Sequence, residues 1–565
     1  MRRSTLILFS RLHDVRKWLL HPQQGLTQWT LLITTLLPLS IMAQQVLSWQ
    51  APPKLVVGIV VDQMRTDYIY RYWDNFGEGG FKRLIGEGAF LRNAHYNYMP
   101  TVTGPGHASI YTGTTPSRHG IVGNDMYDRA TRKTYYCVGD TAMKSVGTTT
   151  TNGKKSPHLL LASTLADELE LRFDRRAKTI GIALKDRSAI LPIGRTGDAA
   201  YWFSGGDFIS TSWYMKELPA WVTAFNGKKL ADHYMSGTWD LVLPRERYHE
   251  VLPDDNPYEI PLKSGMRPSL PVNLDSLRLA GVGAEVLPYT PGGNSITTDM
   301  ALAAITGELM GADAITDLLA ISYSSPDLLG HRVGPRAVEL EDMYIRLDRE
   351  IKRLLEALDA RVGAGEYTIF LTADHGAVDV PAYLKDLKGS AGYVDMGTIA
   401  NHLNGLFMAE VSGGTFAVDT IMDGQVFLRR SGQVLAQRVA STMLRFDMIA
   451  DAMEAGASPS PWGADLRTLM ANGCMPQRSG DVLFALRPNL FEKETWSDGH
   501  GTTHGSGWTY DTHVPVIFFG RGVERGEVLK RTEITDIAPT LCAIVGMALP
   551  NAASGVVVHQ VLGDR

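Results

Sequence analysis

Short apolar runs recur along the chain and predict strands that are buried on both faces. Four of them are rich in β-branched residues and lack alternating polar positions: Lys54–Val61, Thr179–Leu184, Leu318–Tyr323 and Thr368–Thr372. An unbroken apolar run of this length is typical of a central strand in an α/β sheet. Between the last two runs, apolar residues recur at helical spacing and predict an amphipathic helix over Glu341–Val362. This strand–helix–strand order predicts parallel strands whose carboxyl ends meet at one edge of the sheet.

Other apolar segments predict three further helices and one further strand. Two stretches show no regular spacing of apolar residues. We expect helices over Phe81–Gly88, Ile296–Gly311 and Ile534–Val545, and a strand over Val516–Phe519. Around residues 201–289, tryptophans mix with many Pro, Gly and Asp residues, and residues 381–478 are similarly irregular. We therefore predict one α/β catalytic domain over 44–565 with insertions near 201–289 and 381–478, the first packed over one end of the sheet.

The first 43 residues form a separate segment. A basic region precedes an apolar run from Trp29 to Ala43, and the segment carries a net charge of +4. The run is short for a membrane span but has the length of the apolar part of an export signal. We predict a signal peptide over 1–43, a periplasmic mature protein and no stable membrane insertion after cleavage. A retained membrane anchor is the alternative interpretation.

Composition and charge narrow the functional classes. The chain has 565 residues, 44% of them hydrophobic, and its net charge of −5 leaves −9 on the part after residue 43. This acidic balance argues against general nucleic-acid binding. The three cysteines, Cys137, Cys474 and Cys542, form no Cys-x-x-Cys pair, so they do not indicate a thiolate zinc site. They allow at most one internal disulfide, and we expect each of them to serve packing.

The turn over Met99–Ser109 presents one hydroxyl group. Gly104 and Gly106 flank Thr103 and leave room for a ligand to approach the backbone. If the chain is helical from Ala108 onward, Thr103 lies just before a helix N-terminus, where free N–H groups favour an anion. A threonine is a poor nucleophile unless a base or a metal activates it. The turn is therefore catalytic only if the rest of the chain supplies such a partner.

Carboxylates and histidines follow the apolar strands or lie in loops near them. These candidate ligands are Asp62, Asp327, His331, Asp374, His375 and His504. Mixed histidine and carboxylate ligation suits Zn²⁺ with one position left open for water or substrate. Two sets of three can be drawn: Asp327, His331 and His504, and Asp62, Asp374 and His375. Two such ions can clamp the attacking and leaving oxygens of a phosphoryl transfer and activate the Thr103 hydroxyl.

Two further loops supply candidate contacts to an anion. Lys185 and Arg187 follow the second strand, and at alternate positions of an extended segment their side chains point to the same side. Such a pair suits an anion, and a solvated charged loop is the alternative. Asn124 lies beside Gly123 in another loop, where a turn-stabilising role is the alternative to a ligand contact.

Taken together, these motifs resemble those of the alkaline phosphatase superfamily, and more closely those of the bacterial periplasmic phosphatases of the PafA type. The resemblance covers most of the chain after residue 43. Its motifs are Val61-Asp62-Gln63, Thr103-Gly-Pro-Gly-His, Gly123-Asn124-Asp125, Lys185-Asp186-Arg187, Ser325-Pro326-Asp327-x-x-Gly-His331, Thr372-Ala373-Asp374-His375-Gly376, Thr503-His504-Gly505-Ser506 and Thr535-Asp536-Ile537-Ala538-Pro539-Thr540.

The resemblance implies a fold and a reaction. The fold is an alkaline-phosphatase-like three-layer α/β sandwich with a central, mostly parallel sheet and inserted cap-like segments. The reaction is zinc-dependent hydrolysis of small phosphomonoesters through a phosphothreonine at Thr103. By the same resemblance, one Zn²⁺ binds Asp327, His331 and His504, and a second binds Asp62, Asp374, His375 and the Thr103 hydroxyl. Asn124, Lys185 and Arg187 contact the non-bridging phosphoryl oxygens.

Several alternatives remain at this stage. A phosphodiesterase or nucleotide pyrophosphatase of the same superfamily uses the same ligands, although two cations suit a dianionic monoester better than a diester. A zinc-containing binding protein without catalysis is a second alternative. A sulfatase is disfavoured because the cysteine of its motif is missing. His500 is the fallback for His504, His107 and His119 are expected to be structural, and a monomer is the default.

Overall fold

The computed structural model describes residues 51–249, 251–411, 416–430, 432–458, 465–493 and 499–562. The fold below is that of the compact unit Pro52–Arg565. The predicted signal peptide, residues 1–43, lies outside the described residues.

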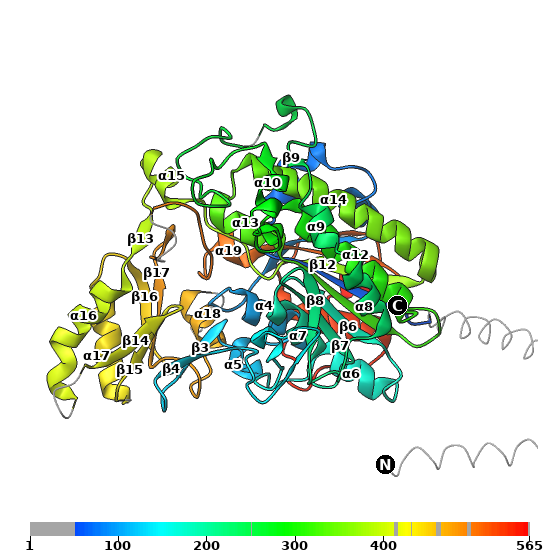
Figure 1. The fold of residues 1–565 in the computed structure, drawn as a ribbon. Helices are drawn as coiled ribbons and strands as arrows, with labels where there is room; N and C mark the ends of the chain where they lie inside the picture. The colour runs from blue at the N-terminus through cyan, green and yellow to red at the C-terminus, as the bar shows by residue number, and fades with distance from the viewer. Residues whose placement is uncertain are drawn as a thin grey trace, which may run out of the picture. The chain divides into compact units, whose positions relative to one another are not determined.

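An eleven-stranded mixed sheet forms the middle of this unit (Figure 1). The strand order is β20-β2-β19-β12-β1-β11-β6-β7-β8-β5, and β21 pairs with β2. The strands are β1 (Leu55–Val61), β2 (Ala89–His95), β5 (Ser145–Val146), β6 (Thr179–Ala183), β7 (Ala199–Ser204), β8 (Asp207–Thr211), β11 (Asp317–Tyr323), β12 (Tyr367–Thr372), β19 (His513–Gly520), β20 (Gly526–Val528) and β21 (Thr532–Glu533).

The parallel centre of the sheet confirms the four strands predicted from apolar runs. Leu55 of β1 lies opposite Asp317 of β11 on one side and Tyr367 of β12 on the other. All seven residues of β1 are buried, because the sheet is covered on both faces. Gly58 in this strand is required by packing, since a Cβ there would lie 2.3 Å from the Tyr111 hydroxyl oxygen. The flanking strands β19 and β8 pair antiparallel. The sheet is therefore mixed, but the pairs that join β12, β1, β11, β6 and β7 are all parallel, which confirms the predicted mostly parallel sheet.

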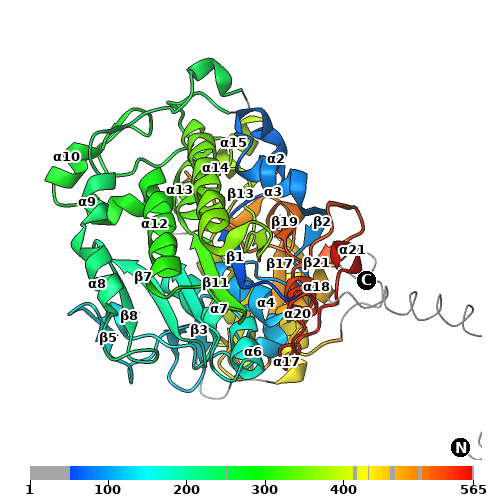
Figure 2. The same ribbon diagram turned by 90° about the vertical axis from the view of Figure 1, so that its right-hand side faces the viewer.

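Helices cover the two faces and complete three layers (Figure 2). One face carries α4 (Thr103–Thr112), α6 (Leu165–Arg172), α7 (Asp186–Ile193) and α20 (Ile537–Val545). The other carries α3 (Phe81–Glu87), α12 (Pro291–Gly307), α13 (Ser325–Val333) and α14 (Val338–Leu358). The apolar stripe of α14, including Met343, Leu347 and Leu354, is buried, which confirms the amphipathic helix.

Some boundaries differ from those predicted. Helix α4 begins at Thr103 itself. Pro105 is tolerated there because it falls in the first turn, where an N–H group would have no carbonyl partner within the helix. The prediction of an extended Lys185–Arg187 segment is wrong: α7 begins at Asp186, and Arg187 lies in its first turn. The strand predicted over Val516–Phe519 is longer in the structure, and Pro515 lies inside it, at a shift in register between Val514 and Val516.

The first predicted insertion starts too early. β7 and β8 belong to the central sheet, so their aromatic residues, among them Tyr201 and Trp202, are buried strand residues. The part outside the sheet contains α8 (Ala220–Gly227), α9 (Leu230–Tyr234), β9 (Thr238–Trp239), η4 (Arg245–Arg247), β10 (Val272–Asn273), α10 (Leu274–Leu279), α11 (Gly283–Val286) and η5 (Leu287–Tyr289). It packs on α14, where Trp239 Nε1 donates to Asp342 Oδ2 at 2.9 Å.

The second irregular stretch contains a small sheet with its own core. The strand order is β14-β15-β17-β16 (Figure 1). Phe484 of this sheet forms one buried core with helix residues such as Leu403 and Val439. Its elements are α15 (Pro381–Asp386), β13 (Gly392–Val394), α16 (Met396–Phe407), η7 (Met408–Glu410), β14 (Val418–Met422), β15 (Gln425–Leu428), α17 (Gln433–Met443), β16 (Ile449–Glu454), α18 (Leu466–Gly473), β17 (Val482–Leu486) and β18 (Leu490–Glu492). The stretch therefore extends past residue 478, because β17 closes its sheet.

Short elements connect these parts. They are α2 (Asp67–Arg71), η2 (Trp73–Asn75), α5 (Pro116–His119), a hairpin of β3 (Asp125–Asp128) and β4 (Lys133–Tyr136), η3 (Thr151–Gly153), η6 (Asp359–Gly363), α19 (Thr509–Thr512), η8 (Ile534–Asp536) and α21 (His559–Leu562). Cys137, Cys474 and Cys542 are buried free thiols, as expected for packing residues. Within the described ranges, no helix combines the length and apolar character that crossing a membrane requires.

Candidate active site

The carboxyl ends of the central parallel strands bring the predicted ligands together. Asp62 directly follows β1, and Asp374 lies two residues beyond the end of β12. Asp327 and His331 lie one turn apart on α13, which begins after β11. His504 comes from the irregular segment before α19. Parallel strands thus place residues far apart in sequence at one edge of the sheet.

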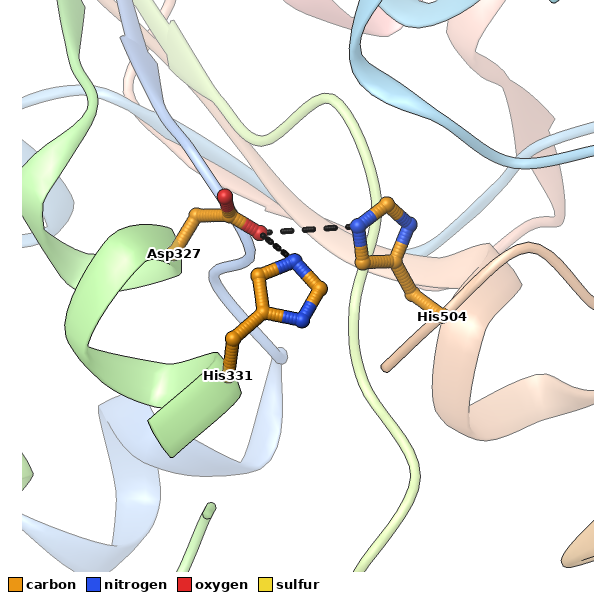
Figure 3. Close-up of side chains that lie close together, drawn as sticks. All are labelled: Asp327, His331 and His504. Atoms are coloured by element: carbon orange, nitrogen blue, oxygen red, sulfur yellow. Dashed lines mark ion pairs between the residues drawn. The ribbon is translucent and has the colours of Figure 1, made fainter. Parts of the chain in front are cut away.

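One cluster consists of Asp327, His331 and His504 (Figure 3). Asp327 Oδ1 lies 3.2 Å from His331 Nε2 and 3.5 Å from His504 Nε2. Both ring nitrogens point to the same carboxylate oxygen, so a cation bound between them would take one ligand from each residue.

A second group lies against the first. The ligand atoms of Asp62, Asp327 and His375 lie within 4.8 Å of one another. The sequence proposed Asp374 here instead of Asp327, and Asp374 Oδ2 also lies close, 3.6 Å from His375 Nε2. The rings of His375 and His504 stack with centroids 3.4 Å apart, so the two groups form one continuous site.

Backbone carbonyls orient all three histidines. Nδ1 lies 2.8 Å from Thr502 O in His331, 3.0 Å from Gly376 O in His375 and 2.8 Å from Thr101 O in His504. A carbonyl oxygen only accepts, so Nδ1 is the nitrogen that carries hydrogen in each neutral ring. The Nε2 lone pairs are therefore left for a metal, an arrangement usual for histidine ligands.

The buried polar atoms fit a divalent cation. Asp62 Oδ1, Asp374 Oδ2 and His375 Nε2 are buried without a hydrogen-bond partner. Burial, together with the negative charges of Asp327 and Asp374, raises the pKa of Asp62. Burial lowers the pKa of His375 and of His504, which favours the neutral rings that bind metals. The donor set contains nitrogen and oxygen, as zinc sites do.

Lys185 supplies positive charge to the centre of the site. Its Nζ donates to Asp62 Oδ2 at 2.6 Å and to Asp327 Oδ2 at 2.5 Å. Burial lowers the pKa of Lys185, but the charges of Asp327 and Asp62 outweigh it and raise the pKa overall. The ammonium group therefore stays charged between the two groups of ligands.

Thr103 lies at the start of α4, in contact with Arg187. The Arg187 Nη2 donates to Thr103 Oγ1 at 3.3 Å. Asn124 Oδ1 accepts a hydrogen bond of 2.7 Å from Gly104 N, and a Cβ on Gly104 would lie 3.1 Å from that oxygen. A Cβ on Gly106 would lie 2.6 Å from Asp374 O. The lack of side chains at these two glycines thus lets neighbouring protein segments lie against the backbone. The sequence had predicted that this room would serve a ligand.

Two residues that the sequence analysis did not assign to the site hold its carboxylates. Gln63 donates from N to Asp374 Oδ1 at 3.2 Å and from Nε2 to Asp327 Oδ1 at 2.7 Å. A Cβ on Gly330 would lie 2.1 Å from Gln63 Oε1, which explains the glycine in Asp327-x-x-Gly-His331. His107 was expected to be structural, and it lies between Thr103 O at 3.0 Å and Asp374 Oδ2 at 3.3 Å.

Tyr136 is a further residue that the sequence did not indicate. It lies on β4, and its hydroxyl donates to Asp186 and accepts from Arg187 Nη1 at 3.0 Å. Lys155 Nζ lies 3.1 Å from Asp186 Oδ2. This network fixes the guanidinium next to Thr103. The contact joins segments about fifty residues apart, so sequence spacing carried no signal for it.

The two remaining histidines lie away from the ligands. His500 Nδ1 lies 2.8 Å from Pro257 O and is exposed, so His504 and not His500 joins the cluster. His119 is buried, 2.9 Å from Ser109 Oγ, as expected for a structural residue.

A cleft of about 600 Å³ opens onto His331, His504 and Asn124. Ile260 and Tyr289 line it from the first insertion. Asp423, Phe484 and Phe491 are among the residues that line it from the second. Both insertions therefore shape the entrance to the site.

Comparison with known proteins agrees with this arrangement. Residues 56–506 match the family of type I phosphodiesterases and nucleotide pyrophosphatases. The chain is 41% identical over 526 residues to a protein of Myroides odoratus named calcium-transporting ATPase, covering 90% of this chain and 95% of that one. It is 38% identical over 528 residues to alkaline phosphatase PhoV of Synechococcus elongatus, covering 91% and 93%.

A solved structure extends the likeness to the fold. The crystal structure of alkaline phosphatase PafA matches with a TM-score of 0.85 at 36% identity, covering 91% of this chain and 99% of that one. The chain therefore belongs to the type I phosphodiesterase/nucleotide pyrophosphatase family and, within it, to the PafA-like alkaline phosphatases.

Proposed function

We propose that this protein is a zinc-dependent phosphomonoester hydrolase that acts through a phosphothreonine intermediate on small phosphomonoesters. The observation that carries the proposal is the contact of the Arg187 guanidinium with the Thr103 hydroxyl. Two residues before Arg187, the ammonium group of Lys185 joins Asp62 and Asp327. A phosphoryl dianion needs positive charge at its oxygens, and this arrangement supplies it. The names of PhoV and PafA support the same activity.

We assign two Zn²⁺ ions to the site. Asp327, His331 and His504 hold one, and Asp62, Asp374 and His375 hold the other, with Thr103 Oγ1 as an added ligand. The oriented histidines and the unpartnered buried oxygens support this assignment. When bound, zinc supplies Lewis-acid charge to the attacking and leaving oxygens.

The chain's own residues carry out the remaining steps. Thr103 Oγ1 gives its proton to water and attacks phosphorus, the bond to the leaving oxygen breaks, and that oxygen takes a proton from water, so that no proton is gained or lost. Asn124, Lys185 and Arg187 hold the non-bridging oxygens, and the N–H groups at the start of α4 favour the anion. Water then cleaves the phosphothreonine, which releases phosphate and restores Thr103.

A phosphodiesterase is the second candidate, because the matching family carries that name. The test is hydrolysis of p-nitrophenyl phosphate and bis-p-nitrophenyl phosphate by the purified mature chain, with EDTA and with zinc added back. A strong monoester preference that requires zinc supports the proposal, and a diester preference contradicts it. ATP belongs in the same assay, because its terminal phosphate is also a dianion and the Myroides relative is named an ATPase.

The roles of the two cations can be tested separately. Lys185→Ala or Arg187→Ala is expected to lower kcat/KM for the monoester by about 10²-fold, because each removes a positive charge that stabilises the phosphoryl dianion. The loss for the diester should be smaller, since a diester carries one charge less. Equal losses for both substrates would contradict the role given to these residues.

We also propose that the protein is exported and monomeric, with residues 1–43 removed and residues 44–565 forming the catalytic domain. The N-terminal sequence of protein from the periplasmic fraction tests the first point, and a start at residue 1 would contradict it. Light scattering of the purified protein tests the second.

A further inference from the structure

Asp511 joins two segments that carry histidine ligands. It is 1% exposed and belongs to α19. Its Oδ2 accepts from Ser506 N at 2.8 Å and from Ser506 Oγ at 2.6 Å, two residues after the ligand His504. Its backbone oxygen accepts from Gly376 N at 2.8 Å, directly after the ligand His375. A single buried residue thus holds the backbone next to two of the histidine ligands.

Ser506 continues this connection to the turn that precedes the nucleophile. Thr101 Oγ1 donates to Ser506 O at 2.8 Å. The backbone oxygen of Thr101 lies 2.8 Å from His504 Nδ1 and orients that ring. Thr101 is buried and lies two residues before Thr103. Hydrogen bonds therefore connect Asp511 through Ser506 to Thr101, and we refer to these three residues as the Asp511 network.

The segment that carries His504 depends on such bonds. Residues 502–506 belong to no helix or strand, so their backbone polar groups need partners elsewhere in the fold. Gly505 has a φ of 121°, a conformation that residues with a Cβ rarely adopt, and its backbone oxygen accepts from Thr101 N at 3.3 Å. The position of His504 is therefore fixed by individual contacts rather than by a regular element.

We propose that the Asp511 network positions the zinc ligand His504 relative to the nucleophile Thr103. The network supplies no ligand itself and acts through the His504 ring. The inference rests on the proposed function, in which the ion that His504 binds supplies charge to the leaving oxygen. Residues that orient metal ligands contribute about 10–100-fold to metal affinity, so loss of the network should be visible in zinc binding as well as in catalysis.

Three variants separate the hydrogen bonds of the network from the charge of Asp511. Thr101→Val keeps the shape of the side chain and removes its bond to Ser506 O. Asp511→Ala removes the acceptor of both Ser506 bonds. Asp511→Asn keeps an acceptor. Because Asp511 Oδ1 is buried without a hydrogen-bond partner, an amide NH₂ group can take its place while the amide oxygen accepts from Ser506.

Thr368→Val is the matched control. Thr368 is also buried, and its Oγ1 donates to the backbone oxygen of a distant residue, Arg521, at 2.7 Å. It lies near the start of β12, whereas the ligand Asp374 follows the other end of that strand. The control loses the same kind of hydrogen bond and should lower Tm without changing the affinity for zinc.

Zinc affinity is measured by titration of metal-free protein with ZnCl₂ in the presence of a competing chelator. The wild type is expected to bind two Zn²⁺ per chain. Thr101→Val and Asp511→Ala should each weaken one of the two by about 10–100-fold, and Asp511→Asn should retain both. Wild-type protein that binds no zinc would contradict the zinc assignment and this inference with it. Unchanged affinities, or equal losses at both sites, in Thr101→Val and Asp511→Ala would overturn this inference alone.

The leaving group provides a second readout, at saturating zinc. Methyl phosphate releases a more basic oxygen than p-nitrophenyl phosphate does, so its hydrolysis depends more on charge at the leaving oxygen. Thr101→Val is therefore expected to lower kcat/KM about tenfold more for methyl phosphate than for p-nitrophenyl phosphate. Equal losses for the two esters would show a general structural defect and contradict the positioning role. Wild-type protein that hydrolyses neither ester would contradict the proposed function, while the zinc titration still decides whether the network positions His504.

Discussion

At the scale of single residues, the site depends on partners that orient each reactive group. Three carbonyl oxygens select the tautomers of His331, His375 and His504. Gln63 ties two of the carboxylates together, from a residue with φ of 65°. A non-glycine residue in this left-handed region is strained, and the two hydrogen bonds offset that strain.

Thr103→Ala tests the nucleophile. The variant is expected to keep both zinc ions, because six ligands remain, and to lose monoesterase activity by about 10³-fold or more, because no group replaces the hydroxyl. Zinc content and kcat/KM for p-nitrophenyl phosphate are the measurements. Thr103→Ser keeps a hydroxyl and should retain activity. Full activity in Thr103→Ala would refute the assignment.

Tyr136→Phe tests the positioning of Arg187. Loss of the hydroxyl removes one hydrogen-bond partner from Asp186 and one from Arg187, at a cost of about 1–3 kcal/mol. We expect kcat/KM for the monoester to fall about tenfold or more, with a smaller fall for the diester. Tyr135→Phe, on the same hairpin, is the control and should change neither value. An unchanged ratio of monoester to diester activity would show that Tyr136 serves folding alone.

At the scale of elements, α4 must lie against the backbone of Asp374 to place Thr103 beside the ligands. A glycine at position 106 permits this approach, because a Cβ would lie 2.6 Å from the Asp374 carbonyl oxygen. The contact joins α4, which carries Thr103, to the segment after β12, which carries Asp374. The distance between these two segments therefore sets the position of Thr103 relative to the metal ligands.

Gly106→Ala should therefore destabilise the fold by about 1–3 kcal/mol and reduce activity, because backbone atoms have to shift. Gly405→Ala in α16 is the matched helical control, since nothing lies within 4 Å of its Cβ. That change should be neutral or stabilising by up to about 1 kcal/mol. Urea unfolding and kcat/KM measure both effects, and equal behaviour of the two variants would contradict the packing argument.

At the scale of the whole molecule, the metal site joins the ends of three parallel strands to the segment that carries His504. The buried carboxylates of Asp62, Asp327 and Asp374 repel one another unless positive charge lies between them, and Lys185 supplies only part of it.

Removal of metal by EDTA is expected to lower stability as well as activity. A ligand at about 1,000 times its Kd contributes about 4 kcal/mol to the folded state. Tm measured by calorimetry should fall on chelation and recover with zinc, while magnesium should fail to restore it. An identical Tm with and without EDTA would show that metal does not hold these segments together.

Much of the architecture was determined by the sequence alone. Runs such as Lys54–Val61 have no polar face and are rich in β-branched residues, which predicts strands that are covered on both sides. The residues that follow them must meet where parallel strands end, and this placed Asp62, Asp327 and Asp374 at one edge before any contact was known.

Only the tertiary structure decided the rest. It put Trp202 in the sheet, began α4 at Thr103 and brought Tyr136 to Arg187. The spacing of apolar and polar residues along the chain indicates only how a residue relates to its neighbours in sequence. These features depend on contacts between segments far apart in sequence, whose free energy exists only once the chain has folded.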